Sequence, residues 1–119
     1  MERIMKVFVV GNIVADQTYS VGRLPNEGES VLGRKISVDL GGKGANQSII
    51  LARSDISTIL IAAIGDDTQA SQLSDRLATE PVVPRLIQIP NTASDSSIII
   101  KDRTGKNVIV TTCGTCSWA

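Results

Sequence analysis

Short apolar runs and stretches with helical spacing alternate along the chain, and this alternation predicts an α/β fold. Two runs rich in β-branched residues, 6–10 and 58–64, each end at a glycine and predict strands buried on both faces. Helices are expected at 45–54 and 68–79, where apolar residues recur at helical spacing. The second helix is followed by Pro81, which cannot continue it.

The rest of the chain has the pattern of β-structure. Weaker extended stretches are expected at 17–24 and 30–40, with a turn at 24–29 between them. Three further strands are expected after the second helix, at 84–89, 96–101 and 108–110, the last two joined by a hairpin-type connection at 102–107. The expected order is three strands, a helix, a strand, a helix and three strands.

Composition indicates one globular domain and excludes several classes of partner. The 119 residues are 42% apolar and 20% charged, and 12 basic residues balance 12 acidic ones, so no net charge attracts nucleic acid or anionic lipid. Only three aromatic residues are present, too few for the stacking surfaces that bind single-stranded nucleic acid. No apolar run approaches the roughly 20 residues of a membrane span, and the N-terminal run is too short for a signal peptide. We therefore expect a cytoplasmic protein with no nucleic-acid or membrane partner.

The sequence GGKGAN at residues 41–46 lies directly before the first predicted helix. Its glycines let backbone amides approach a ligand, and a helix start offers unpaired N–H groups and a positive dipole end. Lys43 adds a charge and Asn46 adds an amide, so the cluster favours a polar, oxygen-rich small molecule. The alternative is a tight turn that merely leads into the helix.

Two standard phosphate-binding motifs do not fit this part of the chain. A Walker A loop ending at Gly42-Lys43 would need glycine where Ser37 stands and Ser or Thr where Gly44 stands. A dinucleotide-binding fingerprint starting at Gly11 would need glycines where Ile13 and Asp16 stand. The cluster is therefore glycine-rich without being a standard nucleotide loop.

Asp16 follows the first strand, at the end of the sheet where α/β folds bind ligands. Its carboxylate can accept two sugar hydroxyls while Lys43 and Asn46 donate from the facing loop. The alternative is a carboxylate that caps a turn.

Two other groups of residues could carry chemistry. Asp66 and Asp67 form either a helix cap or a metal pair, and the cap is favoured at a helix start. Cys113 and Cys116 have C-x-x-C spacing, but the chain has no histidine to complete a zinc site, so incidental cysteines are favoured over a functional dithiol.

Four segments carry a resemblance to a known family: residues 9–16, 24–29, 41–47 and 64–67. With Gly105-Lys106-Asn107 in the later hairpin, the chain resembles the ribokinase family, the PfkB-type carbohydrate kinases, up to about Val110. The resemblance implies a ribokinase-like three-layer α/β fold with a small β lid, of which this chain carries the N-terminal half. Residues 17–40 and 84–112 would be lid strands, which close over the sugar and form a homodimer interface.

The resemblance also implies a site and a reaction. Asp16, Gly42, Lys43 and Asn46 match the family's sugar-binding positions, and the reaction would be ATP- and Mg²⁺-dependent phosphoryl transfer to a hydroxyl of a sugar or nucleoside. Val14 stands where ribokinases have an asparagine that helps to bind the sugar, so the identity of the sugar is open.

The catalytic Asp, the anion hole and the ATP pocket of the family lie in a C-terminal part that these residues do not include. We therefore expect this chain alone to be inactive and to bind ATP and Mg²⁺ poorly. The alternative is a non-catalytic sugar-binding or dimerisation module.

Overall fold

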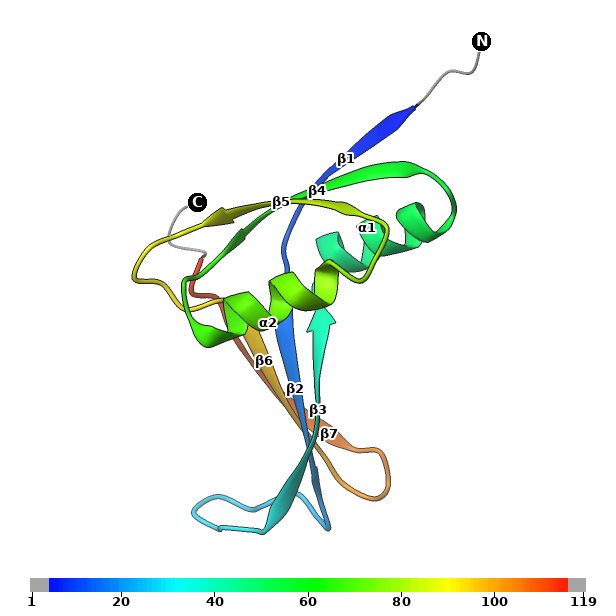
Figure 1. Ribbon diagram of the computed structural model, residues 1–119. Coiled ribbons are helices and arrows are strands. Elements are labelled where there is room, and N and C mark those ends of the chain that lie inside the picture. Colours follow the sequence, from blue (N-terminus) through cyan, green and yellow to red (C-terminus); the bar gives the residue numbers. More distant parts are fainter. Residues whose placement is uncertain (1–4, 116–119) are drawn as a thin grey trace.

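The computed structural model describes residues 5–115, and its elements follow the predicted order (Figure 1). Those elements are β1 Lys6–Val10, β2 Val14–Val21, β3 Gly33–Gly41, α1 Lys43–Arg53, β4 Ser57–Ile64, α2 Thr68–Leu77, β5 Val83–Gln88, β6 Ser96–Lys101 and β7 Asn107–Thr112. The largest differences in bounds are three residues, because β2 covers Val14–Val21 instead of 17–24 and β3 begins at Gly33 instead of residue 30.

The strands form two separate sheets. A parallel sheet has the order β1-β4-β5, and a four-stranded sheet has the order β3-β2-β6-β7, in which only β2 and β6 are parallel neighbours. Figure 1 shows the four-stranded sheet projecting away from the parallel sheet and the helices, and the molecule measures 63 × 33 × 22 Å.

The position of β5 corrects one expectation from the sequence. Residues 84–88 were expected among the lid strands, but β5 pairs in parallel with β4 in the three-stranded sheet. The reason is the crossover through α2, because a strand that returns through a helix lies parallel to the strand before it. The segment expected to form lid strands at 84–112 therefore contributes only β6 and β7 to the four-stranded sheet.

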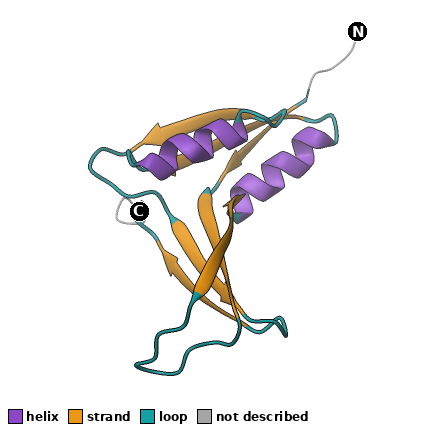
Figure 2. Ribbon diagram, turned by 60° about the horizontal axis from the view of Figure 1, so that its bottom comes forward, coloured by secondary structure: helices purple, strands orange, loops and turns teal. Residues whose placement is uncertain are grey.

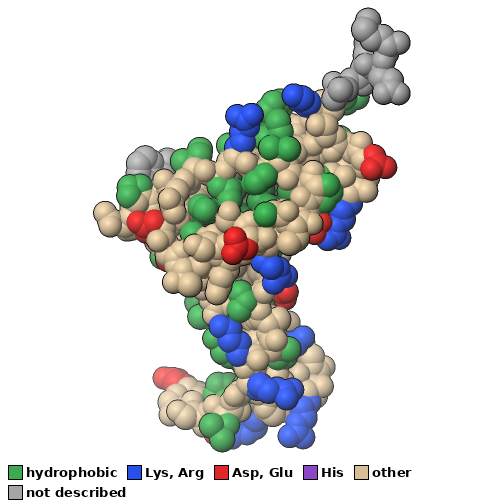
Figure 3. All heavy atoms as spheres, viewed as in Figure 1, with side chains coloured by type: hydrophobic (Ala, Val, Ile, Leu, Met, Phe, Trp, Pro, Cys, Tyr) green, Lys and Arg blue, Asp and Glu red, His purple; other side chains and the backbone are tan. Residues whose placement is uncertain are grey.

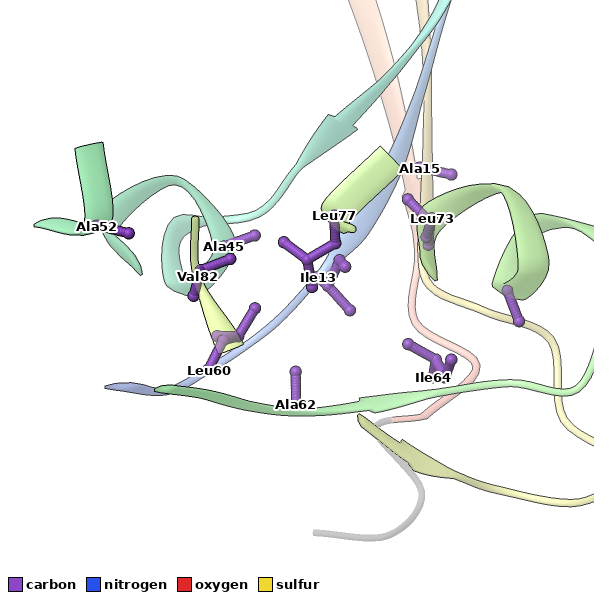
Figure 4. Packing of buried hydrophobic residues seen from close by; sticks show 11 residues of the cluster. Ile13, Ala15, Ala45, Ala52, Leu60, Ala62, Ile64, Leu73, Leu77 and Val82 are labelled. Atoms are coloured by element: carbon purple, nitrogen blue, oxygen red, sulfur yellow. The ribbon is translucent and has the colours of Figure 1, made fainter. Parts of the chain in front are cut away.

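The core lies between the parallel sheet and the two helices, which occupy the same side of that sheet (Figure 2). Figure 4 shows Leu60, Ala62 and Ile64 of β4 pointing toward Ile13 and Leu77. Ile13 is fully buried although it belongs to the connection between β1 and β2. Burial of such a side chain is worth roughly 1.5–3 kcal/mol. The core therefore anchors the loop that leads into Asp16.

The opposite face of the parallel sheet is largely uncovered. Strand alternation places Phe8, Val10, Val83 and Ile87 on this face, with exposed fractions of 58%, 79%, 49% and 59%. We call these four residues the bare face. The expectation that residues 6–10 are buried on both faces is wrong, because only Val7 and Val9 point toward the helices and are half-buried.

Figure 3 gives the distribution of side chains over one side of the molecule. Hydrophobic side chains gather over the part that holds the parallel sheet and the helices, whereas several basic side chains lie over the four-stranded sheet. Neither helix of the described segment has the length and apolarity needed to span a membrane.

Replacing Phe8 and Ile87 together with lysine is expected to reduce self-association of the chain. Exposed apolar patches favour association, and two charges on the bare face would oppose it. Because both side chains are more than half exposed, the melting temperature should change little. Sedimentation velocity over a range of protein concentrations measures the association.

A matched control is Val108→Lys, at a residue of similar exposure on β7 of the other sheet. If this variant dissociates the protein while the double variant does not, copies associate through the four-stranded sheet, and the prediction for the bare face is wrong.

Candidate functional site

The carboxylate of Asp16 packs against the start of the glycine turn. Asp16 lies on β2 directly opposite Asp39 of β3, and its side chain occupies the space beside Gly41. A Cβ atom at Gly41 would lie 2.7 Å from Cγ of Asp16 and would overlap one carboxylate oxygen. A side chain at Gly41 would therefore displace this carboxylate, and Asp16 lies next to the segment that continues into Gly42 and Lys43.

Asp16 is a half-buried carboxylate that accepts no hydrogen bond from residues 5–115. Burial disfavours its charged form and raises its pKa above the ordinary value of 3.8, and the nearby charge of Asp39 raises it further. Every other carboxylate of residues 5–115 that is at least partly buried accepts hydrogen bonds from the chain: Glu29, Asp67, Glu80, Asp95 and Asp102. Asp16 is thus the part-buried acid whose acceptor capacity is left for an external donor.

The glycine turn fits tightly against the connection between β1 and β2. Gly42 is the N-cap of α1 with a φ of 98°, and a Cβ there would lie 2.7 Å from the carbonyl oxygen of Asn12. A Cβ at Gly44 would lie 2.8 Å from both the backbone nitrogen of Asn12 and the Cα of Gly11. Both glycines are therefore required by the turn and by the close approach of a second backbone segment.

The expectation of unpaired amides at the start of α1 is wrong for two of them. The side-chain Oδ1 of Asn12 accepts the Gly44 N–H at 3.2 Å, and the Asn12 carbonyl accepts the Ala45 N–H at 3.1 Å. The backbone N–H of Asn46 donates to the Gly42 carbonyl at 2.9 Å. Asn12 was not among the predicted site residues, although it lies two residues after the first strand, at the end of the sheet where α/β folds bind ligands.

Lys43 and Asn46 are both exposed, and within the described segment their side chains form no hydrogen bond or ion pair. Lys43 lies between Gly42 and Gly44, close to the contact between Gly41 and Asp16. Asn46 lies one turn further along α1 and lines a cavity of about 490 Å³ between the two helices. The structure thus brings the turn that carries Gly42 and Lys43 next to Asp16, whereas Asn46 lines a cavity whose lining includes none of these three residues.

Asp67 caps α2, as the cap interpretation predicted, whereas Asp66 binds a neighbouring loop and does not cap the helix. Asp67 is the N-cap of α2 and accepts the Ala70 N–H at 3.0 Å and the Ser94 hydroxyl at 2.7 Å. Burial alone would raise the pKa of Asp67, but hydrogen bonds from Ser94 and Ala70 outweigh it and lower the pKa. Asp66 accepts the backbone N–H groups of Asn91 and Thr92.

Two further expectations concern metals and cysteines. Residues 5–115 hold no group of three or more His, Cys, Asp or Glu side chains that could bind a metal ion. Cys116 lies outside the described residues, and Cys113 follows β7 with its Sγ 3.5 Å from a carboxylate oxygen of Asp95.

Comparison with known proteins identifies the family. Residues 5–118 match the model of the pfkB family carbohydrate kinases. The chain belongs to this family. The ribokinase of Mus musculus is 29% identical over 114 residues, which are 95% of this chain and 35% of the mouse protein. The ribokinase of Lactococcus lactis is 30% identical over 107 residues, 88% of this chain and 36% of that relative.

Solved ribokinase structures show that the fold is the ribokinase-like α/β fold. The Thermotoga maritima enzyme superposes with a TM-score of 0.81 at 25% identity, covering 89% of this chain and 35% of that one. The Arabidopsis thaliana ribokinase, solved with ribose and ATP, superposes with a TM-score of 0.79 at 26% identity over 89% of this chain and 35% of that one. The pfkB segment described here thus spans little more than a third of the length of its relatives.

Proposed function

We propose that this chain binds the acceptor of a pfkB kinase reaction, a sugar or nucleoside, through Asp16, Gly42, Lys43 and Asn46. The observation that carries the proposal is the half-buried Asp16 carboxylate, which packs against Gly41 and has no donor within residues 5–115. A carboxylate in this state gains most from a ligand that brings hydroxyl donors. The ribokinase relatives support a sugar as that ligand.

Each group has a definite part in the proposed site. Asp16 accepts two hydroxyls, and Lys43 donates to a third oxygen from its ammonium group, which pairs with no side chain of residues 5–115. Gly42 lets the ligand approach the backbone, and the exposed side-chain amide of Asn46, one turn further along α1, offers a donor and an acceptor. Val14 is buried and apolar, so no amide is available two residues before Asp16 and the identity of the sugar stays open.

The described residues do not fit ATP or Mg²⁺. Two amides at the start of α1 are bonded to Asn12, and no cluster of acidic side chains within residues 5–115 could hold a metal ion. We therefore propose that the chain alone binds the acceptor without phosphorylating it. A cytoplasmic location stays a prediction.

A second role is favoured by one observation on the four-stranded sheet. Val108, Ile109 and Val110 of β7 are all exposed, and an apolar edge strand favours pairing with another copy. A homodimer through this sheet is therefore the alternative function, and the Val108→Lys variant tests it.

A thermal-shift panel with D-ribose, 2-deoxy-D-ribose, D-fructose and adenosine tests the proposed function. At a ligand concentration about a hundred times the Kd, the unfolding free energy rises by about 2.7 kcal/mol, so a bound acceptor raises the melting temperature by several degrees. The same ligands with MgATP are expected to give no ADP. Melting that none of the four compounds changes would overturn the binding proposal, and acceptor-dependent ADP formation would overturn the proposed inactivity.

A further inference from the structure

We propose that Asn12 is a positioning residue of the acceptor site, which fixes the turn carrying Lys43 relative to Asp16. The inference rests on the proposed function, because it concerns the same site. Asn12 does not have to touch the ligand for this role. It acts through the backbone at the start of α1.

The geometry places Asn12 on both sides of Lys43. Backbone atoms of Asn12 are the near neighbours of Gly42 and of Gly44, the two residues that flank Lys43. The side-chain oxygen of Asn12 accepts a hydrogen bond from the backbone N–H of Gly44, and the backbone carbonyl of Asn12 accepts one from the backbone N–H of Ala45. Two hydrogen bonds that Asn12 accepts therefore hold the first turn of the helix against the connection between β1 and β2.

The same connection sets the position of Asp16. Ile13, the next residue after Asn12, is fully buried in the core, and β2 begins one residue later at Val14. The backbone N–H of Ala15 donates to the carbonyl of Asp95 at 2.9 Å, which fixes the start of β2. Asn12 thus links a rigidly anchored segment, four residues before Asp16, to a turn made of glycines.

The side-chain bond of Asn12 should affect position more than stability. Asn12 is exposed although Gly44 is buried, and a single hydrogen bond of this kind contributes about 0.5–1.5 kcal/mol, so only a small part of the folding free energy is lost when the side chain is truncated. Glycine on both sides of Lys43 leaves that backbone free to shift once the bond is gone. Because no described side chain holds the Lys43 ammonium group, its location follows the backbone alone.

Two substitutions separate positioning from direct contact with the ligand. Asn12→Ala removes the acceptor for the Gly44 amide, whereas Asn12→Asp keeps an acceptor oxygen at the same place and suits the positive end of the helix dipole. If the Asn12 side-chain NH₂ group donated to the sugar, Asn12→Asp would lose affinity as Asn12→Ala does. If Asn12 is instead a positioning residue, Asn12→Asp should keep the affinity for the ligand that Asn12→Ala loses.

The experiment combines amide hydrogen exchange by NMR with calorimetric titration of D-ribose. Asn12→Ala is expected to speed exchange of the Gly44 amide and to weaken D-ribose binding, each by about five- to tenfold, with an unchanged melting profile. Asn12→Asp should restore both values. Ser54→Ala is the control, because it removes a side-chain bond to the Ile50 carbonyl at the other end of α1.

The outcomes distinguish this inference from the proposed function. Unchanged Gly44 exchange in Asn12→Ala, or a loss of D-ribose affinity in Asn12→Asp equal to that of alanine, overturns the positioning role. If the native chain binds none of the acceptors in the panel, the proposed function fails. The exchange rate of Gly44 then still decides whether Asn12 orders the turn.

Discussion

Asp16→Asn is expected to lower the affinity for the acceptor by about a hundredfold or more while the chain stays folded. Hydrogen bonds to a charged group are worth about 1.5–3 kcal/mol each, and the carboxylate is proposed to accept two. Asparagine keeps the size of the side chain but replaces one acceptor oxygen by a donor, which faces the sugar hydroxyl unfavourably. Calorimetric titration of the acceptor found in the panel measures the loss.

Two further variants serve as controls for Asp16. Asp39→Asn changes the exposed carboxylate directly opposite, which is already bonded to Arg76 at 3.3 Å, and should leave affinity within about threefold. Gly41→Ala should weaken binding without removing the acid, because the added methyl group displaces the Asp16 carboxylate. Native affinity in Asp16→Asn would exclude this carboxylate from the site.

The raised pKa of Asp16 gives an independent signature in the absence of ligand. A carboxylate whose pKa is higher in the folded chain binds protons more readily there, so its contribution to stability is present below pH 3.8 and is lost as pH rises through the folded pKa. Asp16→Asn should therefore melt slightly higher than the native chain near neutral pH, and this difference should shrink as pH falls toward 4. An acid that serves ligand binding in this way reduces the stability of the empty site.

The order of the elements could be predicted from local patterns, whereas their placement in sheets could not. Runs such as 58–64 and the proline after α2 determine local structure directly, and the predicted order is confirmed. Residues 84–88 were assigned to the wrong sheet because a short extended segment has the same local pattern in either sheet. The parallel pairing with β4 determines to which sheet β5 belongs, and such pairing depends on contacts between residues that are distant in sequence.

The same limit explains the errors at Phe8 and at the glycine turn. An apolar run such as residues 6–10 indicates that both faces of a strand suit burial, but it does not show whether these 119 residues supply the cover. The cluster at 41–46 lies at the start of α1, and its alternative interpretation as a turn is right for Gly42 and Gly44, whereas its role in ligand binding stays a prediction. Asn12 accepts hydrogen bonds from two backbone N–H groups of that turn, but it lies more than 30 residues away in sequence and belongs to no recognisable motif.

Gly65→Ala is expected to destabilise the chain by about 3–4 kcal/mol, the sum of overpacking and of disturbed buried hydrogen bonds. A Cβ at Gly65 would overlap the Thr92 carbonyl oxygen and would lie 2.6 Å from the Ser94 backbone nitrogen. These neighbours are backbone atoms, so a side-chain rotation cannot relieve the contact. A loss of this size is a large part of the roughly 5–15 kcal/mol that stabilises a typical domain and should lower the melting temperature by more than about 10 °C.

The destabilisation by Gly65→Ala should extend beyond the mutated residue, because Ser94 connects Gly65 after β4 with Asp67, the N-cap of α2. Its hydroxyl accepts the Gly65 N–H at 3.1 Å and donates to Asp67, the cap of α2, whose Leu73 and Leu77 belong to the core. Gly22→Ala is the matched control, since its nearest neighbour would be the mobile end of Arg103 at 3.5 Å. Circular dichroism melting of both variants tests this prediction. Equal melting temperatures would show that the 92–94 loop shifts to accommodate the added methyl group at little cost in free energy. In that case the hydrogen bonds of Ser94 would add little to the stability of the fold.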